Sequence, residues 1–218
     1  MNDRSGSAGA QGVVRARLHA AVPNGIVVGV ETPERILAAA LRLFAARGYE
    51  AVGVQELAEA AGVTKPPLYH HFGSKEGVLE ALVHGHAEAW LGALTRAAAY
   101  RGDLPFTVFE VARAFFGYAS AHPDYHRLHL SMWYSAPESV PHRVIAPPLL
   151  RQHQALEKLF REAARDHGNL RGHHTAYAIS FAGILNGYIS SLLEVGVALD
   201  EAVAREAARQ FMHGIYAL

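Results

Sequence analysis

The sequence has 218 residues, of which half are hydrophobic and 18% are charged, a balance that predicts a folded core and excludes a disordered chain. Twenty Lys and Arg residues offset twenty Asp and Glu residues, so the net charge indicates neither nucleic acid nor an anionic membrane as a partner. The absence of cysteine excludes disulfides and thiolate chemistry and is typical of a reducing cytoplasm, where we expect the protein to work.

The first 31 residues are rich in Gly, Ser, Ala and Arg, and we expect them to form a flexible N-terminal arm. Arg15 and Arg17 would allow this arm to enter a DNA minor groove, as arms of other DNA-binding domains do. We favour a solvated tail without DNA contact over such an arm. The apolar stretch 26–30 is too short for the core of a signal peptide.

Ordered structure is predicted to begin at Thr32, as a helix N-cap followed by Pro33 in the first turn. Apolar residues then recur at helical spacing until Gly48, which predicts a helix over residues 33–47. A short helix over residues 55–61 and a third over residues 65–72 follow, separated by Gly62. These three helices should form a compact head.

The remaining elements are also helical. With Ser74 as its cap, a long helix is expected to reach residue 100 and to connect the head to a body. Further helices are predicted over residues 104–121, 124–134, 148–167, 175–195 and 200–216, and the Pro- and Ser-rich segment 135–147 is predicted to be a loop. The apolar stretch 179–197 is interrupted by polar residues, so we expect no membrane contact. The predicted class is all-α, a three-helix head plus a six-helix body.

The segment VQELAEAAGVTKPPLYHHFGSK, residues 54–75, meets the requirements of a helix-turn-helix. Small Ala58 allows two helices to cross closely, and Gly62 allows the positive φ that the turn needs. Leu57, Ala61, Val63 and Leu68 would face the core of the head. The opposite face of the second helix would then be free to contact DNA.

Residues 33–82 resemble the TetR family of one-component transcriptional regulators. The resemblance rests on four stretches in the order of that family: PERILAAALRLF, GYE, LAEAAGV and LYHHFGSK. The resemblance implies a DNA-binding domain over residues 32–77 and an effector-binding and dimerisation domain over residues 78–218. It also implies that the DNA-facing residues are Gln55, Thr64, Lys65, Pro66, Tyr69, His70 and Lys75. Tyr69 and Lys75 would mainly contact phosphates, while residues near the start of the recognition helix would reach base edges.

Two residues depart from the family pattern, and each removes a polar contact. Gly53 replaces the usual Ser or Thr cap of the second helix, and Pro67 replaces a small hydroxyl residue that commonly contacts phosphate. The predicted head, residues 33–77, also carries five basic and five acidic residues, so attraction to DNA must depend on their placement. We therefore expect the usable affinity to require a dimer.

A two-fold operator requires two recognition helices about 34–36 Å apart, so the chain should form a homodimer on double-stranded DNA. The resemblance implies that the last two helices of both subunits form the interface. Small residues along residues 175–195 would permit close helix approach. The predicted interface residues are Ile179, Gly183, Asn186, Gly187, Ser190, Phe211 and Ile215. Packing of these residues within one chain is the alternative.

The resemblance also implies an effector pocket in the body, which is dense in aromatic residues. A pocket lined by apolar groups with few polar atoms suits a small lipophilic molecule. The predicted lining residues are Phe109, Phe116, His129, Trp133 and Tyr188, although ordinary core packing is an alternative for each. The function implied is that of a repressor that binds a palindromic operator as a dimer and is released by a small lipophilic effector, with activation as the less common alternative.

Two further hypotheses compete with a ligand-responsive regulator. His122, His126 and His129 are spaced so that one helix face could present three imidazoles to a metal, which would suit a metal-dependent enzyme. Pro123 interrupts that spacing and no recognised catalytic motif accompanies it, so we predict no metal, no cofactor and no enzymatic activity. A dimeric regulator without a ligand is the other alternative.

Overall fold

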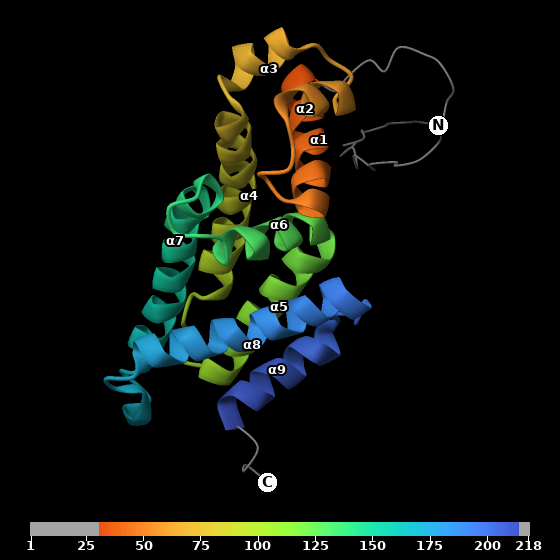
Figure 1. The fold of residues 1–218 in the computed structure, drawn as a ribbon. Coiled ribbons are helices and arrows are strands. Elements are labelled where there is room, and N and C mark those ends of the chain that lie inside the picture. Colours follow the sequence, from red (N-terminus) through yellow and green to blue (C-terminus); the bar gives the residue numbers. More distant parts are fainter. Residues whose placement is uncertain (1–30, 214–218) are drawn as a thin grey trace, which may run out of the picture. The chain divides into compact units, whose positions relative to one another are not determined.

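The computed structural model describes residues 31–213, which lie in one compact unit. Over this range the chain forms nine α-helices, one short 3-10 helix and no strand, which confirms the predicted all-α class. The elements are α1 (Thr32–Arg47), α2 (Val54–Ala60), α3 (Lys65–Phe72), α4 (Lys75–Ala97), α5 (Leu104–Ala121), α6 (Pro123–Trp133), α7 (Val140–Ala163), η1 (Gly168–Leu170), α8 (His174–Val195) and α9 (Glu201–His213). In Figure 1, α4 runs from the α1–α3 group to the remaining helices.

Most helix boundaries agree with the sequence predictions. Helices α3 and α5 begin and end at the predicted residues, and those of α1, α2, α4, α6 and α8 lie within three residues of them. One detail was wrong: Thr32 is the first residue of α1, and Glu31 occupies the N-cap without a side-chain capping bond. The predicted arm, apart from Glu31, and the predicted end of the last helix lie outside the described residues.

The largest error concerns α7. The segment 135–147 was predicted to be a loop, but α7 begins at Val140, after Ser139 has capped it by accepting a hydrogen bond from the His142 amide. The helix then continues through Pro147 and Pro148, which lack the amide hydrogens that would bond to the carbonyls one turn earlier. Packing outweighs this loss, because one face of α7 is buried along its length at Ile145, Gln152, Leu156, Leu159 and Phe160.

Two hydrophobic clusters form the interior. The first, which we call the head core, combines residues of α1–α3 and the start of α4 with Leu128 and Met132 of α6 and Ile145 of α7. The second, the body core, combines the rest of α4 with α5, α7, α8 and α9. Helix α4 contributes Val78–Val83 to the head core and Ala87–Leu94 to the body core. The head core therefore includes residues from beyond the predicted boundary at residue 77, and that boundary stays a prediction.

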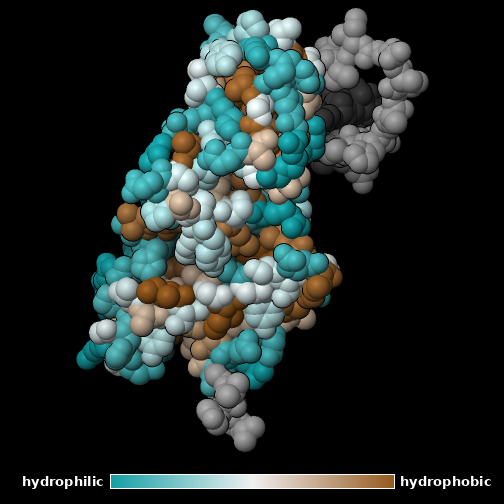
Figure 2. Space-filling model, in the orientation of Figure 1, coloured by the Kyte–Doolittle hydropathy of each residue, from teal (hydrophilic) through white to brown (hydrophobic). Residues whose placement is uncertain are grey.

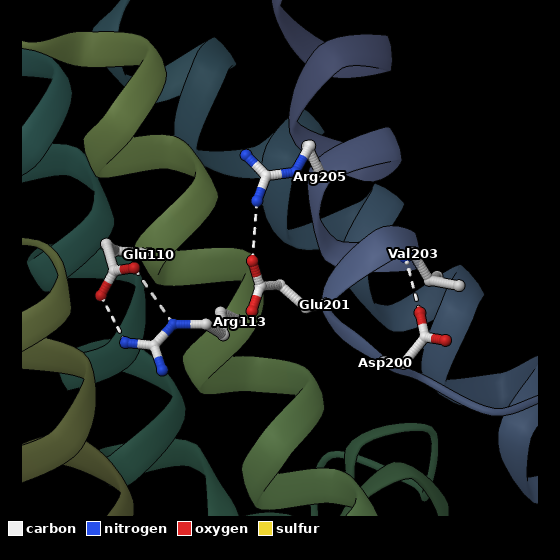
Figure 3. A network of polar contacts seen from close by, with 6 residues as sticks. All are labelled: Glu110, Arg113, Asp200, Glu201, Val203 and Arg205. Atoms are coloured by element: carbon white, nitrogen blue, oxygen red, sulfur yellow. Dashed lines mark hydrogen bonds and ion pairs between the residues drawn. The ribbon is translucent and has the colours of Figure 1, made fainter.

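Helix α9 is held mainly by apolar contacts with α5. Asp200 precedes the helix and accepts a hydrogen bond from the Val203 amide at 3.0 Å (Figure 3). Two ion pairs in the same view, Arg113 with Glu110 and Arg205 with Glu201, each join residues of a single helix and are largely exposed. Such pairs contribute only a few tenths of a kcal/mol. Burial of the α9 residues Ala204, Ala207 and Ala208 therefore does most to hold the helix in place.

The junction of α3 and α4 is closely packed. Gly73 ends α3 at a positive φ of 72°, and the Ser74 hydroxyl then accepts a hydrogen bond from the Gly77 amide at 3.0 Å to cap α4. A Cβ atom on Gly77 would collide with the backbone carbonyl oxygen of Phe72. The angle at which α4 leaves α3 therefore depends on the absence of a side chain at residue 77.

We predict that Gly77→Ala destabilises the protein by about 1–3 kcal/mol, because the backbone of α3 or α4 has to shift to admit the methyl group. Urea unfolding followed by circular dichroism measures the effect. Gly85→Ala is the matched control, since Gly85 is also in α4 but has open space around its Cβ position, and this substitution should stabilise the helix by up to about 1 kcal/mol. Equal effects of the two substitutions would contradict the prediction.

Candidate nucleic-acid interface

Helices α2 and α3 form a helix-turn-helix whose turn is closed by backbone hydrogen bonds. The Gly62 amide donates to the Glu59 carbonyl and the Val63 amide donates to the Ala58 carbonyl, both at 2.9 Å. Gly62 has a φ of 64°, as the sequence predicted. Because Leu57, Ala58 and Leu68 are buried, the two helices are fixed against the head core.

A side chain from α1 braces this turn. The Arg35 guanidinium donates from Nη2 to the carbonyl oxygens of Ala61 at 2.6 Å and Gly62 at 2.9 Å. These carbonyls follow α2 and would otherwise lack partners, as helix-terminal carbonyls often do. Arg35 therefore stabilises the turn, a role that sequence reasoning missed because the residue lies 26 positions before the carbonyl that it contacts.

One face of α3 is open to solvent, and most of the predicted DNA-facing residues lie there. Thr64, Lys65, Pro66, Tyr69 and His70 are exposed, and the Tyr69 side chain is 48% exposed. The Thr64 side chain makes no capping bond to its own helix. On α2, Gln55 is exposed as well, with its amide donating to Glu59 at 2.5 Å. The turn and α3 thus present hydroxyl, ammonium, phenol and imidazole groups on one surface.

Lys75 differs from the expectation. Its ammonium nitrogen Nζ donates to the carbonyl oxygens of Tyr49 and Val52, each at 3.1 Å, and lies 4.0 Å from the centroid of the Tyr49 ring. The side chain is half-buried and turned toward the loop between α1 and α2. The Lys75 ammonium therefore has a structural role in the head, where it satisfies two loop carbonyls. That Lys75 also contacts phosphate stays a prediction.

Internal contacts use most of the basic residues of the head. Arg35 and Lys75 bind backbone carbonyls, while Arg47 pairs with Glu56 and donates to the Ala51 carbonyl. Within residues 31–213, neither Arg42 nor Lys65 has a hydrogen-bond or ion-pair partner. Of these two cations, Lys65 is the one on the exposed face of α3, so the positive charge available to a phosphate backbone is concentrated at the start of that helix.

The predicted effector-lining residues do not converge on a single cavity in the described structure. Phe116 is buried beside Tyr188, with ring centroids 5.6 Å apart, and His129 is buried beside Trp133, with ring centroids 6.3 Å apart. Phe109 lines a different hollow, a cavity of about 280 Å³ between α5 and α9, where the Arg205 guanidinium lies over its ring. These five residues therefore do not line one common effector pocket in the described structure.

A layer of buried and half-buried imidazole and phenol groups lies where the head core meets the body core. His86 of α4 stacks on Tyr125 of α6 at 4.1 Å, and the Tyr118 hydroxyl of α5 donates to the His86 carbonyl at 3.0 Å. His126 and His129 of α6 are 6% and 7% exposed, and one ring nitrogen of each, Nε2 and Nδ1 respectively, has no partner within the described residues. Tertiary packing creates this layer, so no local sequence pattern could have identified His86 and Tyr118.

Burial keeps these imidazoles neutral at pH 7. Desolvation, with a smaller contribution from neighbouring histidines, lowers the pKa of His126 from 6.5 to about 3, and desolvation alone lowers that of His129 to about 4. The pKa of His86 falls to about 4, first through desolvation and then through His122. His122 itself is exposed, and no three metal-ligating side chains converge within residues 31–213. The spacing of His122, His126 and His129 therefore produces no metal site in the described region.

The predicted dimer residues divide into two groups. Ile179, Gly183, Gly187 and Ser190 are exposed along one face of α8 and Asn186 is partly exposed there, whereas Ala178, Phe181, Leu185 and Ile189 are buried on the other. Phe211 of α9 packs within the chain, 4.6 Å from the Phe181 ring. Intrachain packing thus explains Phe211, and Ile215 lies outside the described residues.

Helix α8 is long and apolar, and most of it is uncovered. Among the described helices it is the one with the length and composition to cross a membrane, and 28% of its most apolar window is buried. Figure 2 shows hydrophobic patches separated by pale stretches on the face along which α8 runs in Figure 1. Length and composition alone are a weak indication of a membrane span.

Comparison with known proteins gives the head a clear family likeness. Residues 36–82 match the family model of bacterial regulatory proteins, tetR family. The transcriptional activator FasR of Mycolicibacterium smegmatis is 33% identical over 94 residues, which is 43% of each chain. The transcriptional repressor KstR2 of Rhodococcus jostii is 40% identical over 57 residues, 26% of this chain and 28% of that protein. The chain thus matches less than half the length of these curated relatives.

Solved structures extend the likeness to the body. The TetR family regulator PfmR of Thermus thermophilus superimposes with a TM-score of 0.67 at 27% identity, over 83% of this chain and 98% of that one. The regulator FadR of Bacillus subtilis, solved in complex with stearoyl-CoA, has a TM-score of 0.71 at 16% identity, over 84% and 98%. At that identity the second likeness shows a shared fold and no more.

The buried imidazoles predict that stability falls as the pH is lowered. Because the pKa values of His126 and His129 are lower in the folded chain than in the unfolded one, the unfolded state binds more protons below about pH 6.5. Stability should be constant above about pH 7.5. Between pH 6.5 and pH 5 each of the two residues should remove about 1.5 kcal/mol, and the loss continues toward the lowered pKa values.

Urea unfolding at several pH values measures this loss. His126→Phe replaces the imidazole by a ring that does not titrate, and should reduce the loss between pH 6.5 and 5 by about 1.5 kcal/mol, leaving the contribution of His129. His153→Phe, in α7, is the matched control, since neither ring nitrogen of His153 is a buried atom without a partner, and it should keep the dependence of the natural chain. A dependence that His126→Phe leaves unchanged would show that this histidine is not held neutral by burial.

Proposed function

The chain belongs to the TetR family of bacterial regulators, and from this premise we propose that it binds double-stranded operator DNA as a homodimer under the control of a small lipophilic effector. The observation that carries the proposal is the exposed face of α3, which the helix-turn-helix holds in place and on which Lys65 has no partner among residues 31–213. Proteins with this motif place the second helix in the major groove. We propose a regulator without enzymatic activity or cofactor that works in the cytoplasm.

We propose that residues at the start of α3 read bases and that others position the helix. Thr64, Lys65, Pro66 and His70 lie where a recognition helix reaches base edges, and the exposed Tyr69 hydroxyl suits a phosphate oxygen. Gln55, at the start of α2, is a further candidate for a contact with the DNA phosphate backbone. Pro66 and Pro67 have no amide hydrogen to donate to a phosphate. The Lys65 ammonium is therefore one of the few groups at the start of α3 that can bind one.

The open face of α8 supports a homodimer. Gly183 and Gly187 have nothing within 4 Å of their Cβ positions, so another helix can approach closely. Asn186 on this face favours a protein partner over a bilayer, because a polar side chain facing lipid is costly. We therefore propose that α8 of a second copy covers Ile179, Gly183, Asn186, Gly187 and Ser190, and we retain Ile215 as a further contact.

A lipophilic effector in the body is supported by two aromatic pairs with one buried member each, Phe116 with Tyr188 and His129 with Trp133. FadR of Bacillus subtilis, which shares the fold, was solved with stearoyl-CoA. Phe109 would belong to this site only if the cavity between α5 and α9 extended to it. We propose repression as the mode of regulation because KstR2 and AcnR, two of the relatives, are named repressors, although FasR is named an activator.

We predict that Lys65→Ala weakens binding to DNA by about tenfold or more, the effect of losing one base or phosphate contact, without lowering thermal stability. Fluorescence anisotropy at fixed low salt, on duplexes selected by the natural chain from a random pool, measures the affinity. Lys75→Ala should instead lower the melting temperature, since its ammonium binds two carbonyls inside the head.

Lys158→Ala, at an exposed lysine of α7, is the control and should change neither property. Failure of the natural chain to select any duplex, or affinity unchanged in Lys65→Ala, would contradict the assignment of α3 as the DNA-reading helix.

We predict that Gly187→Glu converts the dimer to a monomer, because a buried carboxylate would keep the two α8 helices apart. Light scattering after gel filtration gives the mass. Gly117→Glu is the matched control: Gly117 is also an exposed helical glycine with open space around it, on α5, and this variant should remain dimeric. A natural chain that is monomeric, or that sediments with phosphatidylcholine vesicles, would count against a second copy as the partner of α8.

A further inference from the structure

A cavity of about 480 Å³ opens between the head and the body. Its walls come from α1, α4 and the end of α5, and it is within the range of about 300–1,000 Å³ typical of small-molecule sites. The lining residues are Leu37, Ala38, Leu41, Ala81, Leu82, Gly85, His86, Ala89, Tyr118 and His122. Small residues of α4, at positions 81, 85 and 89, recur every fourth residue and leave the space on one face of that helix.

Its lining distinguishes this cavity from three smaller ones on the described residues. Those three, of about 280, 350 and 400 Å³, are each lined by at least two arginines. The 480 Å³ cavity contains no Asp, Glu, Lys or Arg. An ionised ligand would lose part of its hydration there without gaining an opposite charge, and such a loss is unfavourable. The lining is therefore matched to an uncharged molecule.

The polar groups of the cavity lie on α4, on α5 and just after α5. The Tyr118 hydroxyl donates to the His86 carbonyl at 3.0 Å and lies 3.0 Å from His86 Nδ1, so Nδ1 must carry the hydrogen and donate back to the hydroxyl. His86 Nε2 is then an acceptor, and no residue within 31–213 donates to it. Burial lowers the His86 pKa to about 4, which preserves this acceptor at pH 7. The exposed imidazole of His122 stands beside it, with ring centroids 5.2 Å apart.

We propose that this cavity is a binding site for a small, uncharged, mostly apolar molecule that carries one hydrogen-bond donor, such as a hydroxyl or a secondary amine. The apolar part contacts Leu37 and Leu41 of α1 and the small residues of α4, and the donor binds His86 Nε2. This site is separate from the effector lining proposed for the body. A ligand in it touches α1 in the head and Tyr118 in the body at once.

N-phenyl-1-naphthylamine is a suitable probe, because it is uncharged, apolar and carries one N–H donor, and its fluorescence rises in apolar surroundings. Its matched analogue, 8-anilinonaphthalene-1-sulfonate, has the same rings with a permanent negative charge. Fluorescence titration of the full chain, without DNA, should show saturable binding of the uncharged probe and binding of the sulfonate at least tenfold weaker. Because DNA is absent, the result is independent of the proposed operator binding.

Gly85→Leu locates the site. The new side chain meets no atom within 4 Å of its Cβ, so it can fill the cavity without displacing the fold, and it should weaken binding of the uncharged probe at least tenfold. Gly117→Leu, on the exposed face of α5, gains the same side chain in a helix and should bind the probe as the natural chain does. Amide chemical-shift changes on adding the probe should include Ala38 and Ala89.

Three outcomes would overturn the proposal. The first is equal affinity in Gly85→Leu and Gly117→Leu, which places the probe elsewhere. The second is equal binding of the two probes, which shows that the lining does not select against charge. The third is binding that appears only after residues 1–30 are deleted, which identifies that segment of the chain as the natural occupant of the cavity.

Discussion

Helix α4 has to serve two hydrophobic cores at once, and the rest of the structure depends on this constraint. Its first two turns complete the head core, its later turns complete the body core, and His86 lies at the change from one to the other. A single rigid helix shared in this way fixes where α3 lies relative to the body. Gly77 of α4 also packs closely against the end of α3, so the orientation of α4 determines the orientation of the candidate DNA-reading helix.

The change from one core to the other is marked by polar groups rather than by a gap. Three of the four buried polar side chains of the described residues, His126, His129 and Gln152, lie on α6 and α7, the two body helices that also contribute to the head core. Trp90 of α4 donates to Gln152 at 2.7 Å, whereas the two imidazoles each keep a nitrogen without a partner. Buried polar groups of this kind favour one arrangement of the helices, since sliding α4 would break hydrogen bonds that water cannot replace.

Local sequence signals predicted the parts of the fold that depend on local chemistry. Gly62 and the capping residue Ser74 allowed the helix-turn-helix and the start of the long helix to be found, and both behave as expected. Where tertiary contacts dominate, sequence reasoning failed. The prolines of α7 indicated a loop although burial keeps the segment helical, and no local pattern showed that the Lys75 ammonium binds carbonyls of a distant loop. His86 and Tyr118 are 32 residues apart and no periodicity relates them.

The two prolines of α7 also divide that helix mechanically. Pro147 and Pro148 leave the carbonyls of Arg143 and Val144 without their usual helical partners. Arg143, before the prolines, pairs with Glu76 near the start of α4, and Arg151, after them, pairs with Glu88 further along the same helix. Each half of α7 therefore has its own exposed ion pair with α4. Bending α7 at the prolines would cost less than bending it elsewhere, because two of the hydrogen bonds across this point are already missing.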